Sequence, residues 1–294
     1  MTPTDAKTSF PSLKVQPMDI DNRPRNLSFV RSAPERHWLG GDPVATAWFN
    51  ALSLTFPDGE RFFIDAVKAH RHLAEGKLAE DVKDFIVQEA LHTREHAALN
   101  GHIDHGHYPV DKIEAMVKAR TDLGRTRGPI PMLVVTTCLE HFTAILADDM
   151  LKNDKDLSAA PDNLRRLWLW HAVEETEHKS VAYDLWQRVA ARWSHFGRYM
   201  IRVRAMAIVS CMFMWNVTTY ALMLLKADGI TGFEARKRLY GYLLGRPGPL
   251  RRIAGAYFDW YRPGFHPWDH DNRTLLDQWR PVFDAEARAI QAAE

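Results

Sequence analysis

Apolar side chains recur at helical spacing along most of this chain, and polar breakers divide the pattern into segments. A first helix is predicted to begin at Pro43 and to kink or restart at Pro57, because proline suits a first turn but removes a hydrogen bond inside a helix. Further helices are predicted over about 79–100, 132–151 and 161–192. Successive helices of this kind predict an all-α protein.

The last of these segments carries ionisable residues on its apolar face. His171, Glu175 and His178 are separated by four and three residues, which places them within about 60° of one another on one side of a helix. Leu167 and Leu185 continue the same face, so it is expected to point inward. An unpaired charge buried there would be costly, and a metal ion would remove that cost by coordinating the carboxylate and the imidazoles.

The three other helices carry comparable residues on faces that are expected to be buried. Glu60 lies in an apolar stripe of the first helix, and Glu89, His92 and His96 share one face of the second. Glu140 in the third helix has only small residues beside it, which are expected to leave space for a substrate or dioxygen. These small residues are Thr136, Thr137, Thr143, Ala144 and Ala147.

Together the four helices present a ligand set for two metal ions. One Glu from each of two helices and Glu-x-x-His from each of the other two is the set of four-helix di-iron and di-manganese proteins. Oxygen and imidazole donors without thiolate favour iron, with manganese or zinc as alternatives. Glu174 is the alternative to Glu175, and Glu174 and His96 are expected either to orient the ligand imidazoles or to act as general bases. The predicted ligands are Glu60, Glu89, His92, Glu140, His171, Glu175 and His178.

Composition indicates the compartment of the protein and the classes of partner that it is expected to lack. The 294 residues include fourteen His and only two cysteines, Cys138 and Cys211, which argues against a disulfide framework and favours a reducing compartment. The N-terminal segment lacks the basic start and apolar middle of a secretory signal, so a cytoplasmic protein is expected. The net charge of +1 gives no reason to expect nucleic acid as a partner.

Two flanking regions differ from the central segment 43–192. Residues 1–42 contain five prolines, too closely spaced for a long helix, and are expected to form an extended arm. Residues 193–294 are expected to form a helical extension, in which the run 205–225 carries no charge. Between residues 192 and 252 there are eleven Lys or Arg and two acids, a local charge of +9. The uncharged run is therefore expected to be a core helix, a peripheral membrane contact or a membrane span.

The candidate ligands lie in four segments of distinctive sequence. These segments read FPDGERFF, FIVQEALHTREHAALN, TTCLEHFTAILA and WHAVEETEHKSVAYD. Together they resemble the four blocks of the bacterial ferritin-like family of predicted metal-dependent hydrolases, over about residues 12–265. The resemblance implies a ferritin-like four-helix bundle with a metal centre. The pattern of His171, Glu175 and His178 is similar, more distantly, to a helix of arylamine N-oxygenases, in which an additional His joins the usual di-iron set.

These features favour a non-haem dinuclear iron oxygenase or oxidase, which would use dioxygen and an electron donor to act on a hydrophobic small molecule or a lipid-like substrate. Two alternatives stay open from the sequence. One is a dinuclear metal-dependent hydrolase, in which the two metals activate a water. The other is a bundle without catalysis, which either binds metal or pairs its buried Glu and His residues without it. The oligomeric state is open as well, a homodimer included.

Overall fold

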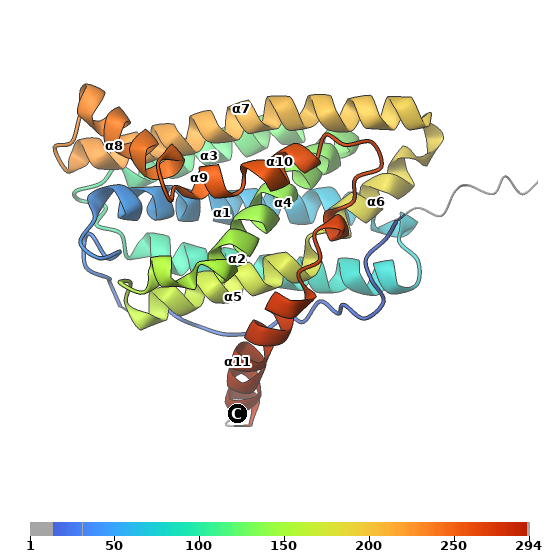
Figure 1. Ribbon diagram of the computed structural model, residues 1–294, viewed down its shortest axis with the longest axis horizontal. Helices are drawn as coiled ribbons and strands as arrows, with labels where there is room; N and C mark the ends of the chain where they lie inside the picture. The colour runs from blue at the N-terminus through green and yellow to red at the C-terminus, as the bar shows by residue number, and fades with distance from the viewer. Residues whose placement is uncertain (1–13, 31, 293–294) are drawn as a thin grey trace, which may run out of the picture.

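The computed structural model describes residues 14–30 and 32–292, and within these ranges every regular element is a helix (Figure 1). The all-α prediction is therefore confirmed for the described residues. The central bundle consists of α1 (Pro43–His70), α2 (Lys77–Gly101), α4 (Pro129–Lys152) and α5 (Asp162–His178). The remaining helices are α3 (Val110–Arg125), α6 (Val181–Val189), α7 (His195–Ala227), α8 (Gly232–Leu244), α9 (Pro249–Arg252), α10 (Ala254–Asp259) and α11 (Arg273–Gln291).

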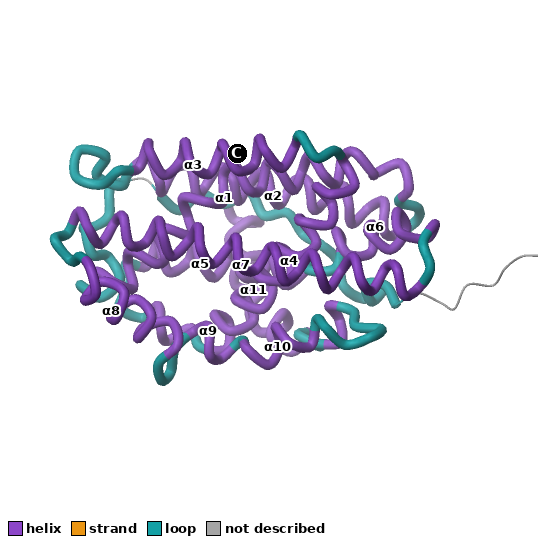
Figure 2. The backbone as a smooth tube through the Cα atoms, turned by 90° about the horizontal axis from the view of Figure 1, so that it is seen from above, coloured by secondary structure: helices purple, strands orange, loops and turns teal. Residues whose placement is uncertain are grey.

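The smaller helices surround the bundle. Seen from above, α8, α9 and α10 lie along one long side of the body and α3 along the other (Figure 2). The last helix, α11, leaves the body on the side away from α7 (Figure 1). It has 19 residues and belongs to the helical extension that the sequence predicts over 193–294.

α1 runs through Pro57 as one helix, so the chain does not restart there. A proline cannot donate to the carbonyl four residues earlier, which here belongs to Ser53. The side-chain amide of Asn100 on α2 donates to this carbonyl instead, at 3.1 Å. At its start the helix is capped by Asp42, whose carboxylate accepts hydrogen bonds from backbone N–H groups of the first turn. A single rigid helix therefore carries Glu60.

The predicted helix over 161–192 is two helices, because the chain turns at Lys179 and Ser180 between α5 and α6. Lys179 is buried at this turn, where its ammonium donates to the carbonyl of His270 at 2.6 Å and lies 3.8 Å from the ring centre of Trp268. These contacts with a loop far along the chain hold the turn. The prediction of one continuous helix is wrong, and His178 is the last residue of α5.

An extended segment, residues 14–30 and 32–42, precedes the bundle and follows α2 and α5 (Figure 1). The backbone N–H of Arg25 donates to Glu174 on α5 at 2.9 Å, and that of Phe29 donates to Glu95 on α2 at 2.8 Å. The guanidinium of Arg25 also binds Glu177, at 2.9 Å. Buried carboxylates on the outer sides of both helices are thus satisfied by this segment.

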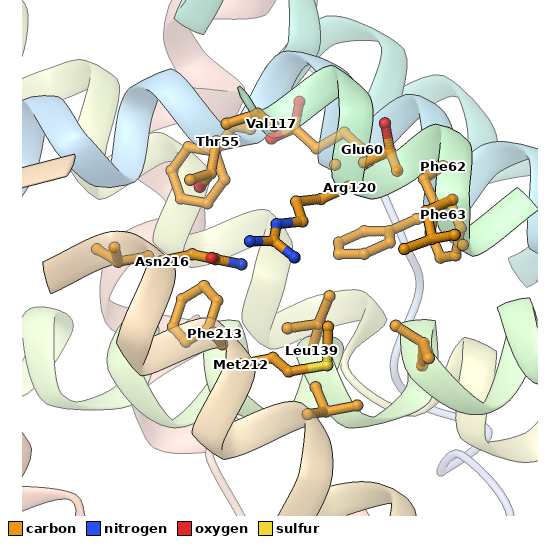
Figure 3. A pocket seen from close by; sticks show the side chains of 18 of the residues that line it. Thr55, Glu60, Phe62, Phe63, Val117, Arg120, Leu139, Met212, Phe213 and Asn216 are labelled. Atoms are coloured by element: carbon orange, nitrogen blue, oxygen red, sulfur yellow. The ribbon is translucent and has the colours of Figure 1, made fainter. Parts of the chain in front are cut away.

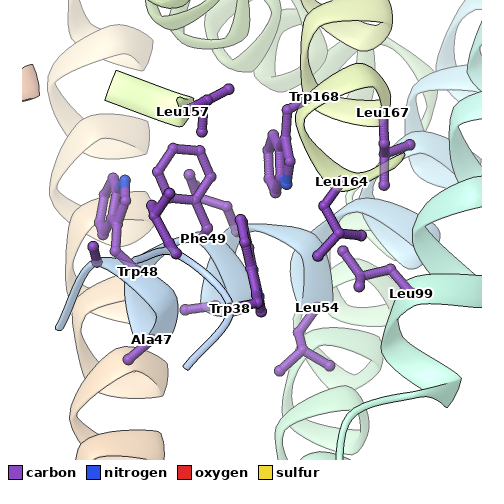
Figure 4. Close-up of a cluster of buried hydrophobic side chains, with 14 of the residues drawn as sticks. Trp38, Ala47, Trp48, Phe49, Leu54, Leu99, Leu157, Leu164, Leu167 and Trp168 are labelled. Atoms are coloured by element: carbon purple, nitrogen blue, oxygen red, sulfur yellow. The ribbon is translucent and has the colours of Figure 1, made fainter. Parts of the chain in front are cut away.

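Two apolar clusters flank the middle of the bundle. One contains Trp38, Phe49 and Trp168, and the rings of Phe49 and Trp168 meet edge to face with centres 4.8 Å apart (Figure 4). The other contains Phe85 and Trp186. Because both clusters exclude water, charges on polar groups between them interact strongly.

α7 packs one face against α1 and α4 and leaves the other face exposed. Met206 and Tyr220 on the packed face are buried, whereas Ile208 and Trp215 on the outer face are 61% and 72% exposed. By length and composition both α4 and α7 could cross a membrane, and the most apolar window is 61% buried in α4 but 44% buried in α7. The uncharged run 205–225 is therefore partly core and partly surface.

Candidate metal centre

The bundle brings all seven predicted ligands together between the two apolar clusters. Every one of them is buried, and they come from α1, α2, α4 and α5. Three groups of three have ligand atoms within 4.8 Å of one another. The groups are Glu60, His92 and His171; Glu89, Glu140 and His178; and Glu89, His92 and Glu175.

Eight buried atoms of this cluster have no hydrogen-bond partner. Leaving one such atom unsatisfied costs about 1–3 kcal/mol, so a cluster of eight calls for a ligand. All eight are carboxylate oxygens or imidazole nitrogens, which are donors for divalent metals. Two divalent cations would also neutralise the four carboxylates. The eight atoms are Oε1 of Glu60, both carboxylate oxygens of Glu89 and of Glu140, Nδ1 of His92, Oε2 of Glu175 and Nε2 of His178.

His92 and His178 each use one ring nitrogen to bind an outer partner. Nε2 of His92 lies 3.1 Å from a carboxylate oxygen of Glu174, which leaves Nδ1 toward the cluster. Nδ1 of His178 donates to the side-chain carbonyl of Gln88 at 3.1 Å, and its Nε2 faces Glu89 at 3.3 Å. In both residues the partner fixes the ring orientation and the nitrogen that is free to bind a metal.

His171, the third histidine among the predicted ligands, is held by a longer chain of hydrogen bonds. The hydroxyl of Ser53 donates to the side-chain carbonyl of Asn100 at 2.7 Å, so it accepts from Nδ1 of His96, 2.9 Å away. Nε2 of His96 then accepts from Nδ1 of His171, at 2.7 Å. Nε2 of His171 is left without a proton, 3.0 Å from Glu175. His96 has both nitrogens occupied, which argues against the general-base role considered for it.

The two neighbouring glutamates of α5 differ in their surroundings. Glu174 accepts hydrogen bonds from the backbone of Arg25 at 2.9 Å and from the indole of Trp170 at 3.0 Å, and it contacts His92. Glu175 lies 3.4 Å from Nε2 of His178 and has one oxygen without a partner. Glu175 therefore faces the cluster, while Glu174 lies behind His92.

Burial and charge crowding perturb the protonation of the cluster. Burial, followed by the neighbouring carboxylates, raises the pKa of Glu60, Glu89 and Glu140 well above the usual range. Burial alone would lower the pKa of His178, but Glu175 and Glu140 raise it to about 9. These pKa directions fit a buried site in which the carboxylates carry more negative charge than the imidazoles can balance. A metal would supply the missing positive charge.

A cavity of about 370 Å³ adjoins the cluster at Glu60 (Figure 3). Its wall comes from α1, α3, α4 and α7 and is mostly apolar, with Phe62, Phe63 and Phe213 among the lining residues. The space predicted beside Glu140 is present only in part, where the cavity reaches Thr143. Of the five small residues near Glu140, Thr143 alone lines this cavity.

The small residues beside Glu140 instead allow the helices to pack closely. Thr136 and Thr137 are buried, and the hydroxyl of Thr137 lies 3.3 Å from the carbonyl of Ala182 on α6. The cavity forms where α3 and α7 cross α1, an arrangement that the periodicity of a single helix does not specify.

Several residues around the centre were missed by reasoning from the sequence. Gln88 is the outer partner of His178, Ser53 binds His96, and Arg25 binds Glu174 from the extended segment. A buried Gln one position before a candidate ligand is a weak signal, and Arg25 lies in a stretch without periodicity. His105, in the loop between α2 and α3, was not predicted as a ligand, and it contacts Asp111 at 2.8 Å on the surface.

The fold and the centre define an all-α protein with a buried site for metal ions. Residues 23–271 match the family described as predicted metal-dependent hydrolase. The match covers most of the chain, so this protein belongs to that family. No curated protein and no solved structure matches the chain, and the expected likeness to ferritin-like proteins and arylamine N-oxygenases is not shown by these comparisons.

Proposed function

We propose that this protein is a dinuclear metal-dependent hydrolase whose substrate binds in the cavity beside Glu60. The eight unpartnered ligand atoms carry the proposal that the site holds metal. The family description favours hydrolysis over the oxygenase chemistry that the sequence led us to expect. The cavity supplies the place for a substrate with an apolar part.

The ligand groups suggest how two ions would be held. Glu60, His92 and His171 would hold one ion, and Glu140 and His178 the other. Glu89 belongs to two of the groups, and Glu175 contacts both His171 and His178, so these two carboxylates would complete the ligand set. Iron suits the oxygen and imidazole donors best, with manganese or zinc as alternatives. When bound, the pair would supply Lewis acidity and a water of lowered pKa.

Glu60 is the predicted ligand that also lines the cavity. One of its oxygens accepts a hydrogen bond from the hydroxyl of Thr93 at 2.9 Å, and the other has no partner. This free oxygen, Oε1, is the atom of Glu60 that would hold an ion, so the centre would border the cavity at this residue. Glu174 and His96 are engaged by other residues, so their proposed part is to position His92 and His171.

Oxygen-dependent chemistry is the second candidate. A cavity wall built largely of Phe and aliphatic side chains suits the hydrocarbon part of a substrate, and nitrogen and oxygen ligands suit iron. A dinuclear iron oxygenase would in addition need dioxygen and an electron donor.

Turnover in the absence of oxygen separates these functions. The protein is loaded anaerobically with Fe(II), Mn(II) or Zn(II) and assayed against apolar esters and amides under nitrogen and in air. Hydrolysis under nitrogen supports the proposal, whereas product formation only with oxygen uptake supports the oxygenase. Full metal loading with no turnover in either atmosphere would overturn both and leave a metal-binding bundle. The His105→Ala variant is the control, because it changes a residue on the surface and should keep the metal content and turnover of the unchanged protein.

A further inference from the structure

Two arginine side chains line the largely apolar cavity. Arg120 on α3 and Arg127, just before α4, both contribute to its wall. The guanidinium of Arg120 points into the cavity, near Asn216 of α7 (Figure 3). Among the described residues neither arginine has a carboxylate partner, unlike Arg125 between them, which binds Asp65 at 3.1 Å.

An arginine without a carboxylate partner is suited to bind an anion from solution. The planar guanidinium presents paired N–H donors that match carboxylate, phosphate or sulfate oxygens. The rest of the cavity wall is largely apolar and includes Phe62, Phe63 and Phe213. The cavity volume of about 370 Å³ lies within the range of about 300–1,000 Å³ for small-molecule sites. One polar region and one apolar region therefore share a single site.

The cavity can be reached from solvent. Leu123 and Met212 both line it and are also 50% and 48% exposed. Arg120 and Arg127 line the cavity and are exposed as well, so both are accessible from solvent. Glu60 lies on α1, with its carboxylate among the predicted ligands. A molecule that enters at the arginines with its charged end thus has an apolar wall available for the rest of its length.

We propose that the cavity binds a single-chain anionic amphiphile that carries an ester or amide bond in its chain, with its headgroup held by Arg120 and Arg127 and its chain against the apolar wall beside Glu60. The inference deepens the proposed function, because it names the substrate class of the same site. The headgroup is a carboxylate or a phosphate, since both match the guanidinium donors.

Calorimetric titration of the zinc-loaded protein tests the headgroup. The probes are decanoate, decyl phosphate, decanol and decylamine, which share a chain and differ at one end. Decanoate or decyl phosphate should bind at least about tenfold more tightly than decanol, and decylamine should bind most weakly. The stronger of the two anions identifies the headgroup. Equal binding of decanol and both anions would overturn the proposal.

Substitutions assign the preference to the two arginines. Arg120→Gln and Arg127→Gln should each reduce the anion preference, and the double variant should abolish it, while Arg120→Lys should retain part of it. Arg236→Gln on α8 is the matched control, since Arg236 is exposed and lies outside the cavity wall. If the double variant keeps the preference, the anion is bound elsewhere, at the metals for example, and the proposal is wrong.

The binding result and the turnover result are independent of each other. An anion preference that depends on the arginines stands even if no ester or amide is hydrolysed, and in that case only the proposed function fails. Hydrolysis of neutral esters without an anion preference would support the proposed hydrolase function. It would contradict the proposal that the substrate is an anionic amphiphile.

Discussion

His96 accepts a hydrogen bond from His171, with 2.7 Å between Nε2 of the first ring and Nδ1 of the second. Burial and then the neighbouring imidazole of His171 hold the pKa of His96 well below its ordinary value, so the ring stays neutral and keeps its acceptor nitrogen. The contact fixes one tautomer of His171 and aims its other nitrogen at the carboxylates. A residue outside the ligand set thereby determines which atom of a ligand can bind metal.

Replacing His96 by Leu should weaken metal binding about 10–100-fold without unfolding the bundle. The leucine keeps apolar volume but accepts no hydrogen bond, so His171 loses its fixed orientation. Competition with a chromogenic chelator measures the affinity, and circular dichroism checks the fold. Unchanged affinity would show that the His96 contact has no part in metal binding.

Glu175→Gln should remove metal, whereas Glu174→Gln should leave the site filled with reduced affinity. Glu175 faces the cluster with a free oxygen, and Glu174 supports His92 from behind. Metal content after dialysis, measured by mass spectrometry, distinguishes the two. His105→Ala is the control that should keep full occupancy. If Glu174→Gln empties the site and Glu175→Gln does not, the assignment of the two residues is reversed.

Metal uptake should release protons, and metal affinity should rise with pH. Burial, and then neighbouring carboxylates, raise the pKa of Glu89 and Glu140, so these carboxyls hold protons in the metal-free protein near neutral pH. A carboxyl with a higher pKa when folded binds more protons in the folded state, so the metal-free protein should lose stability as pH rises. Titrations in buffers of different ionisation enthalpy, between about pH 6 and 8, count the protons. Metal uptake with no proton release would contradict the prediction.

The outer face of α7 should bind anionic vesicles. Ile208, Met212 and Trp215 expose apolar surface between the charges of Arg204 and Lys226, and a basic residue near an anionic surface contributes about 1 kcal/mol. Co-sedimentation should show binding to anionic but not neutral vesicles, weakened by salt and by Trp215→Ser. Failure to bind either vesicle, together with a concentration-dependent dimer, would assign this face to a second copy of the chain.

The clustering of the seven candidate ligands could be predicted because their spacing fixes a helical face. Offsets of three, four and seven place His171, Glu175 and His178 on one side of α5 whatever else the chain does. Leu164 and Leu167 continue this face, so it was expected to be buried. The separation of Glu174 from Glu175 follows from the same offsets, since Glu175 and His178 repeat the spacing of Glu89 and His92.

The surroundings of the ligands depend on contacts that no periodicity encodes. The turn at Lys179 is held by a loop about ninety residues later, and Arg25 reaches Glu174 from a segment without helical pattern. The cavity forms beside Glu60 rather than Glu140 because α3 and α7 approach α1 there. Sequence spacing identifies the face of a helix, but packing decides which face borders empty space.

The extended segment and α11 both bind the carboxylate of Glu177 on α5, so this contact forms late in protein synthesis. Arg25 and Arg280 both bind Glu177, and Arg25 also binds Asp284 at 2.6 Å. A ribosome synthesises Arg25 long before Asp284, and domains emerge from the N-terminus onward. The nascent chain can therefore build the four ligand helices while this network is still incomplete, and the support behind α5 closes only when α11 has left the exit tunnel.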